Sequence, residues 1–283
     1  MNISNKTGYL HQQLKLFYLS DQRDWKCPYH YHDFDKITIF LQGSVTYEIE
    51  GKSYVLQPYD IVIVRAGQMH RPIISGSAVY ERIIAYIAPS FFMYCKKRNC
   101  DVSTVFTQNT SHVLRQPQEM GSIFGTTCRL RQAFSQKEND CMLLQETIFL
   151  EFMIFLSQAV QQKWLGSVKT GPQNEKIQTI IAYINQNLTT PLTVSSLAVR
   201  FYISPDYLMH LFKKETGYSI AQYITTKRLV LARSLIEKSI PLTTVCYDSG
   251  FKNYSTFYRA WKHFFHTSPS KGSWKIEEPG FSE

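Results

Sequence analysis

The sequence predicts an α+β protein with two domains. The N-terminal domain is expected to be a β-barrel or jelly roll with long helices, and the C-terminal domain to be all-α and built from two helix-turn-helix units. Three observations favour this class: short β-branched runs between turn residues over 36–86, a helical pattern over 139–165, and two similar helical passages about 48 residues apart near the C-terminus. With 283 residues, the chain is long enough for two separate cores.

Four short strands are expected in the first half of the chain. They are runs rich in β-branched and aromatic residues over 36–41, 45–49, 54–56 and 61–64. The turns that follow them are Gly43, Glu50-Gly51, Pro58-Tyr59-Asp60 and Ala66-Gly67. Regular punctuation of this kind is typical of an all-β barrel or jelly roll.

Three histidines flank these strands. His30 and His32 stand two residues apart before the first strand, so on extended backbone both side chains point to the same face. His70 follows the fourth strand. The arrangement resembles the two cupin motifs, in which a His-x-His-x3-Glu segment and a later histidine supply metal ligands.

Two residues depart from that pattern. Lys36 occupies the position of the glutamate, and Tyr59 replaces the usual glycine before Asp60. A lysine ammonium has no lone pair and repels a cation, so the four-ligand site is broken. We therefore expect no metal, no other cofactor and no catalytic residue. A small-molecule site is preferred over a metal site and over histidines satisfied within the core. The residues assigned to this effector site are His30, His32, Lys36 and His70.

A helix without Gly or Pro in its interior is expected over residues 139–165. Its apolar residues, among them Leu144, Ile148 and Phe152, form a stripe broader than one face against a small barrel would need. The helix is interpreted either as a dimerisation element or as packing against its own barrel. The segment 166–174, which contains Gly, Ser and Pro, is expected to be a flexible linker.

About seven helices are expected in the C-terminal half. Isoleucines at helical spacing from Ile177 to Ile184 predict the first. Ser204 is a good N-cap for another helix, with Pro205 at the favoured first position. The remaining helices are expected over residues 193–201, 219–238, 242–249 and 254–265, with Pro269 starting a closing helix.

In a helix-turn-helix unit, the second helix enters the DNA major groove. We expect this helix to have one buried side and one exposed side in each of the two units. The expected core residues are Leu208, Leu211 and Phe212 in the first unit and Phe257, Trp261 and Phe264 in the second. The outward residues are therefore candidates for DNA contact: Asp206, Met209, His210, Lys213, Lys214, Tyr254, Ser255, Tyr258, Arg259 and Lys262.

The outward side chains carry chemistry that suits DNA. Arg259 is assigned to guanine, because its planar fork matches the O6 and N7 acceptors. His210 can bond a base edge, Met209 can touch a thymine methyl, and Lys213 is better placed for phosphate. The net charge is +9, and residues 200–276 hold twelve Lys and Arg against four Asp and Glu. Phosphate binding needs this sign, although a solvated basic surface is the alternative.

Residues 176–276 resemble the DNA-binding domain of the AraC/XylS family of transcription regulators. The matching positions are Ser204-Pro205-Asp206-Tyr207-Leu208, Phe212-Lys213-Lys214-Glu215-Thr216-Gly217, Tyr223-Ile224, Lys227-Arg228-Leu229, Ala232, Ser249-Gly250-Phe251, Tyr254-Ser255, Phe257, Arg259 and Ser268-Pro269. The resemblance implies a cupin-like effector-binding domain at 1–138, a helical dimerisation segment at 139–165, a linker at 166–174 and an AraC-type DNA-binding domain at 175–276.

The resemblance also implies a function. A sequence-specific transcription regulator is expected, more often an activator, that responds to a small molecule such as a sugar or related carbon source. Its expected partners are double-stranded DNA, the effector, RNA polymerase and a second copy of the chain. The alternatives are a metal-binding cupin enzyme with a DNA-binding tail, which Lys36 disfavours, and an architectural DNA binder, which leaves the β domain unexplained.

The remaining features predict a soluble cytoplasmic protein without a membrane partner. The six cysteines lack metal-type spacing such as C-x-x-C and are interpreted as reduced structural thiols. The N-terminus lacks the apolar run of a signal peptide. The most apolar stretch, residues 148–156, is too short to span a bilayer.

Overall fold

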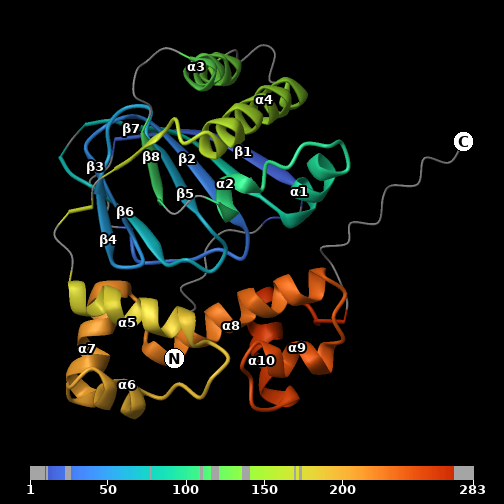
Figure 1. Ribbon diagram of the computed structural model, residues 1–283. Helices are drawn as coiled ribbons and strands as arrows, with labels where there is room; N and C mark the ends of the chain where they lie inside the picture. The colour runs from blue at the N-terminus through green and yellow to red at the C-terminus, as the bar shows by residue number, and fades with distance from the viewer. Residues whose placement is uncertain are drawn as a thin grey trace, which may run out of the picture.

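The structure is a computed structural model that describes residues 10, 12–22, 27–76, 78–108, 111–115, 121–135, 141–168, 170–171 and 174–270. A β domain with helices on its outer side lies against a second domain that is entirely helical (Figure 1). The predicted α+β class with two structural parts is confirmed.

Two antiparallel sheets form the β domain in the described part of the chain. The six-stranded sheet has the order β1 (Leu14–Asp21), β7 (Tyr80–Ile87), β2 (Asp35–Gln42), β5 (Ile61–Val64), β8 (Val113–Arg115) and β9 (Gly166–Ser167). The three-stranded sheet has the order β4 (Lys52–Val55), β3 (Val45–Ile49) and β6 (His70–Ile74). No strand ladder joins the two sheets within the described residues. The domain is thus a cupin-like jelly roll held by side-chain packing, which is one of the two forms expected, and it is not a closed barrel.

Strand β2 is buried on both of its faces. Ile37 and Ile39 point to the outer face of the six-stranded sheet. The inner face, toward the three-stranded sheet, carries Phe40 together with the polar side chains of Lys36 and Thr38. Polar and apolar residues therefore still alternate over residues 36–39, although both faces are covered. The strands predicted over 45–49 and 61–64 match β3 and β5, and the other two match β2 and β4 within two residues.

Helices cover the outer face of the six-stranded sheet. They are α1 (Pro89–Lys96), α2 (Thr104–Thr107), α3 (Ser122–Ser135) and α4 (Met142–Gln161). In Figure 1, α3 and α4 lie above the sheet, on the side away from the helical domain. Helix α4 buries Ile148, Phe149 and Phe152 in the core of that sheet, and α3 packs along α4. The broad apolar stripe is therefore used within one subunit, because α4 is covered from two sides.

Helix α4 also has the length and composition of a membrane span, with mean hydropathy 1.4 over an 18-residue window. Its central side chains are core residues of the β domain, which accounts for their apolar character. The exposed apolar residues lie in its first turn: Met142, Leu143 and Leu144.

The segment expected to be a flexible linker is partly strand. Gly166 and Ser167 pair with β8 at the edge of the six-stranded sheet. The amide of Gly171 donates to the carbonyl oxygen of Ser53 in β4, at 2.8 Å. Backbone hydrogen bonds therefore attach parts of this segment to both sheets.

The helical domain contains α5 (Glu175–Gln186), α6 (Val194–Arg200), α7 (Pro205–Thr216), α8 (Ile220–Glu237), α9 (Leu242–Asp248) and α10 (Tyr254–Phe265). Ile177 and Ile184 are buried, as their spacing predicted. The closing helix expected after Pro269 lies almost wholly outside the described residues, so six of the roughly seven expected helices are seen.

The six cysteines are free thiols. Cys27, Cys95 and Cys246 are buried, which fits a structural role, whereas Cys128 and Cys141 are exposed. The prediction of structural thiols therefore fits the three buried cysteines and does not fit the two exposed ones.

Candidate nucleic-acid interface and effector cluster

Side-chain caps fix the two recognition helices, α7 and α10. The Ser204 hydroxyl accepts a hydrogen bond from the Tyr207 amide at 3.3 Å, and α7 ends at Gly217, which has φ +77°. Asn253 starts α10 by accepting from the Thr256 amide at 2.8 Å. Such caps satisfy backbone groups that helix ends leave unpaired, so local sequence sets where each recognition helix begins.

The ten predicted DNA contacts lie outside the helical core. Asp206, Met209, His210, Lys213, Lys214, Tyr254, Ser255, Arg259 and Lys262 are exposed, and Tyr258 is half-buried. All six predicted core residues of the two helices are buried. The side chain of Arg259 reaches only its own helix, where Nε donates to the Ser255 carbonyl at 3.4 Å, and no carboxylate pairs with it in the described chain.

Sequence reasoning missed two exposed tyrosines beside this surface. Tyr202 is 93% exposed in the turn of the first unit, and Tyr207 is 53% exposed in the first turn of α7. Tyr207 stands three residues before His210, so a helical-wheel count would have placed the two side chains next to each other.

One stripe of α8 lies on the β domain. Lys227 Nζ is 2.7 Å from Glu50 Oε1, and the Tyr223 hydroxyl donates to Glu50 Oε2 at 3.4 Å. Six residues further along the helix, Arg233 Nη1 donates to the Asp33 carbonyl at 2.6 Å. Helix α8 also packs against α7, α9 and α10. The β domain therefore holds the one helix that both helix-turn-helix units share.

The segment 27–34 has two different faces. Tyr31 stacks on Phe264 of α10, with ring centroids 5.2 Å apart and planes 6° apart, and the Tyr29 hydroxyl donates to the last-turn carbonyl of Glu215 in α7 at 3.4 Å. The histidines at the alternate positions 30 and 32 point into the jelly roll. This period of two is that of extended backbone.

The four residues assigned to the effector site come together in the jelly roll. Candidate ligand atoms of His30, His32 and His70 lie within 4.8 Å of one another, and all three side chains are buried. Lys36 Nζ donates to the Tyr47 hydroxyl at 3.3 Å and lies 3.5 Å from His70 Nε2. Burial and the nearby Lys36 charge lower the pKa of His30 to about 4 and hold that of His70 well below its usual value.

The cluster does not fit a metal ion. His70 Nδ1 faces the Gln68 carbonyl at 3.0 Å, so Nδ1 carries the ring proton and Nε2 accepts from Lys36. Burial lowers the pKa of Lys36 to about 8, which leaves the ammonium mostly charged at neutral pH. A cation here would therefore meet a positive charge, and one of its three imidazole lone pairs is already used.

We expect the substitution Lys36→Glu to create a metal site that the natural chain lacks. The change removes the repelling charge and supplies the carboxylate that completes a set of three histidines and one acid. Metal content should be measured after incubation with zinc or manganese and removal of free metal. The natural protein should retain far less than one equivalent, and Lys36→Glu about one; stoichiometric metal in both would contradict the argument from Lys36.

Two families of known domains match the two parts of this chain. The helix-turn-helix domain family matches residues 197–272, and the AraC-like ligand binding domain family matches residues 16–152. The lactose operon transcription activator of Staphylococcus xylosus is 26% identical over 86% of this chain and 85% of its own length. The multiple antibiotic resistance protein MarA of Escherichia coli is 33% identical over 34% of this chain and 76% of its own length. Among solved structures, ToxT from Vibrio cholerae aligns with 94% of this chain and 100% of its own, at 14% identity and a TM-score of 0.38.

A ligand-binding type of β domain, joined to two helix-turn-helix units with exposed recognition helices, defines a DNA-binding transcription regulator. The chain belongs to the AraC/XylS family of such regulators, as the matched families and the similarity to MarA show.

Proposed function

We propose that the protein is a cytoplasmic transcription activator that responds to a small effector of the sugar or carbon-source type. The similarity to a lactose operon transcription activator, which extends over 86% of this chain, supports both activation and the class of effector. The observation that carries the proposal is the contact between the β domain and α8, in which Glu50 and Asp33 bind residues of that helix. A ligand that binds one arrangement of this contact better than another shifts how both recognition helices are presented to DNA.

The proposed effector contacts are His30, His32, Lys36 and His70. These side chains are buried, so a ligand reaches them only if part of the surrounding structure moves. His30 and His32 belong to segment 27–34, which also carries Tyr31, and Tyr31 stacks on Phe264 of α10. Binding at the cluster would therefore change a contact with the second recognition helix. The protein is proposed to be a regulator without enzymatic activity.

The proposed partners are double-stranded DNA, RNA polymerase and a second copy of the chain. Most of the apolar surface of α4 packs within its own subunit. The dimer contact is therefore proposed at the exposed first turn of that helix: Met142, Leu143 and Leu144.

Genome-wide binding and transcript measurement test the proposal together. The intact protein should bind upstream of genes for uptake or breakdown of one carbon source, and deletion of its gene should lower their transcripts. If deletion of the gene raises these transcripts, the protein is a repressor and not an activator. Binding spread evenly over the genome would contradict sequence-specific regulation.

Each subunit should protect about 20 base pairs of DNA. Two recognition helices that enter successive major-groove segments on one face of the duplex place their base contacts about 10 base pairs apart. Footprinting on variants of the preferred site, with base pairs altered in turn, measures this spacing. A single short element of about five base pairs would show that only one unit reads bases.

Arg259→Ala should cost about 1–3 kcal/mol of affinity on the preferred site and little on random DNA, because a bidentate contact to guanine is lost. Lys213→Ala, which removes a proposed phosphate contact, should weaken binding to both DNAs alike. Titrations at fixed salt measure the four affinities. Equal loss on both DNAs for Arg259→Ala would make this residue a phosphate contact.

A further inference from the structure

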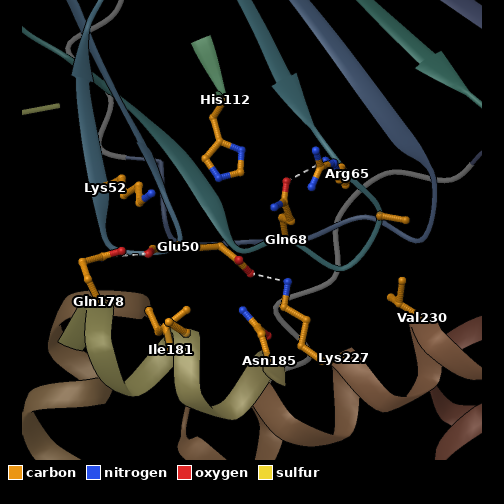
Figure 2. A pocket seen from close by; sticks show the side chains of 12 residues that line it. Glu50, Lys52, Arg65, Gln68, His112, Gln178, Ile181, Asn185, Lys227 and Val230 are labelled. Atoms are coloured by element: carbon orange, nitrogen blue, oxygen red, sulfur yellow. Dashed lines mark hydrogen bonds and ion pairs between the residues drawn. The ribbon is translucent and has the colours of Figure 1, made fainter. Parts of the chain in front are cut away.

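A cavity of about 640 Å³ lies between the β domain and the helical domain. Figure 2 shows its two walls: the turns after β3 and β5 on one side, and helices α5 and α8 on the other. It is separate from the effector cluster, since none of the four cluster residues lines it. A ligand in this cavity would touch both domains at once.

The cavity has an excess of positive charge. Lys52, Arg65 and Lys227 line it together with a single carboxylate, that of Glu50. Glu50 is already engaged, because its Oε1 lies 2.7 Å from Lys227 Nζ. Lys52 forms no ion pair within the described residues. The lining therefore holds three cationic side chains and one carboxylate, so the cavity carries a net positive charge.

Arg65 supports the same conclusion from its surroundings. Burial lowers the pKa of its guanidinium, against the opposing effect of nearby carboxylates. A low-dielectric site penalises the charged form, and an anion bound beside it offsets that penalty.

Amide side chains also line the cavity. Gln178 Nε2 donates to the Glu50 carbonyl at 3.4 Å, and Asn185 Oδ1 accepts from the Tyr223 hydroxyl at 3.2 Å, which leaves the amide nitrogen of Asn185 for another partner. Amides recognise hydroxyl groups by donating and accepting, while Ile181 and Val230 offer apolar surface to a carbon skeleton.

We propose that this interdomain cavity binds a small hydroxylated organic anion, a sugar phosphate or a sugar acid, with Lys52, Arg65 and Lys227 as its charge partners. Its anionic group competes with Glu50 for the Lys227 ammonium. Because Lys227 belongs to α8, the ligand weakens a contact that holds this shared helix on the β domain. The proposal does not require the histidine cluster to bind anything.

Calorimetry on the intact protein tests the site. The probes are hexose 6-phosphates and gluconate, the corresponding neutral hexoses, and inorganic phosphate, all at physiological salt. At least one sugar anion should bind, and the neutral hexoses should bind at least tenfold more weakly. Comparison of the hexose 6-phosphates with gluconate shows whether the site prefers a phosphate or a carboxylate group. No binding by any sugar anion, or equal binding by inorganic phosphate, overturns the proposal.

Variants locate the binding. Lys52→Gln should weaken the sugar anion about tenfold or more, whereas Lys96→Gln removes the same charge from the exposed surface of α1 and should change nothing. Ala182→Phe fills the cavity from α5 without changing its charge, and should also weaken binding. Glu50→Gln frees Lys227 and should strengthen it. Undiminished binding in both Lys52→Gln and Ala182→Phe places the anion elsewhere and overturns the proposal.

Discussion

Gly250→Ala should destabilise the helical domain by about 2–5 kcal/mol. The variant should also lose DNA binding at temperatures close to its melting temperature. Gly250 has φ +91°, and left-handed backbone of this kind costs an alanine about 1–2 kcal/mol. A Cβ atom at this position would also lie 2.8 Å from Arg228 Nε and closer still to the Leu188 carbonyl oxygen. Overpacking adds about 1–3 kcal/mol.

The collision falls on a hydrogen bond that joins the shared helix α8 to the loop between α5 and α6. Arg228 Nε donates to Leu188 O at 2.8 Å, so the added methyl group has to displace that contact. Gly76→Ala is the matched control, because Gly76 has φ +78° and nothing within 4 Å of a built Cβ. Denaturant unfolding of both variants separates the backbone cost from the collision. Equal losses would mean that the close approach at Gly250 relaxes without cost.

Lys227→Met should lower the free energy of unfolding by about 3–5 kcal/mol, because it leaves the Glu50 carboxylate buried without its ion-pair partner. The two side chains are only 14% and 9% exposed, so water compensates little. The substitution should weaken the contact between the two domains. A protease should therefore cleave segment 166–174 faster in the variant, and denaturant unfolding should show the lower stability.

Two comparisons separate the buried pair from charge loss in general. The double variant Lys227→Met with Glu50→Gln removes both charges and should recover most of the stability. Arg129→Met breaks the ion pair to Glu151, whose side chains are 55% and 36% exposed, and should cost about 1 kcal/mol or less. A Lys227→Met variant as stable as Arg129→Met would show that the Glu50–Lys227 contact does not hold the domains together.

Much of the helical domain was predictable because its signals are local. Ser204 and Asn253 cap helices through atoms three residues away, and the buried face of α10 follows from the spacing of Phe257, Trp261 and Phe264. Local hydrogen bonds and helical periodicity act over one or two turns, so one stretch of sequence contains them whole. The identity of the operator contacts stays a prediction, since exposure alone does not distinguish a base from a phosphate.

The sequence by itself determined the two-domain α+β class, the tandem helix-turn-helix units, and the shared face of His30 and His32. Only the tertiary structure decided that α4 is covered on two sides, that the jelly roll stays open between its sheets, and that Tyr31 faces α10. It alone brought Glu50 to α8, across a separation of 173 residues from Tyr223. Such contacts depend on the packing free energy of segments far apart in the chain, and no local pattern encodes which distant surfaces complement each other.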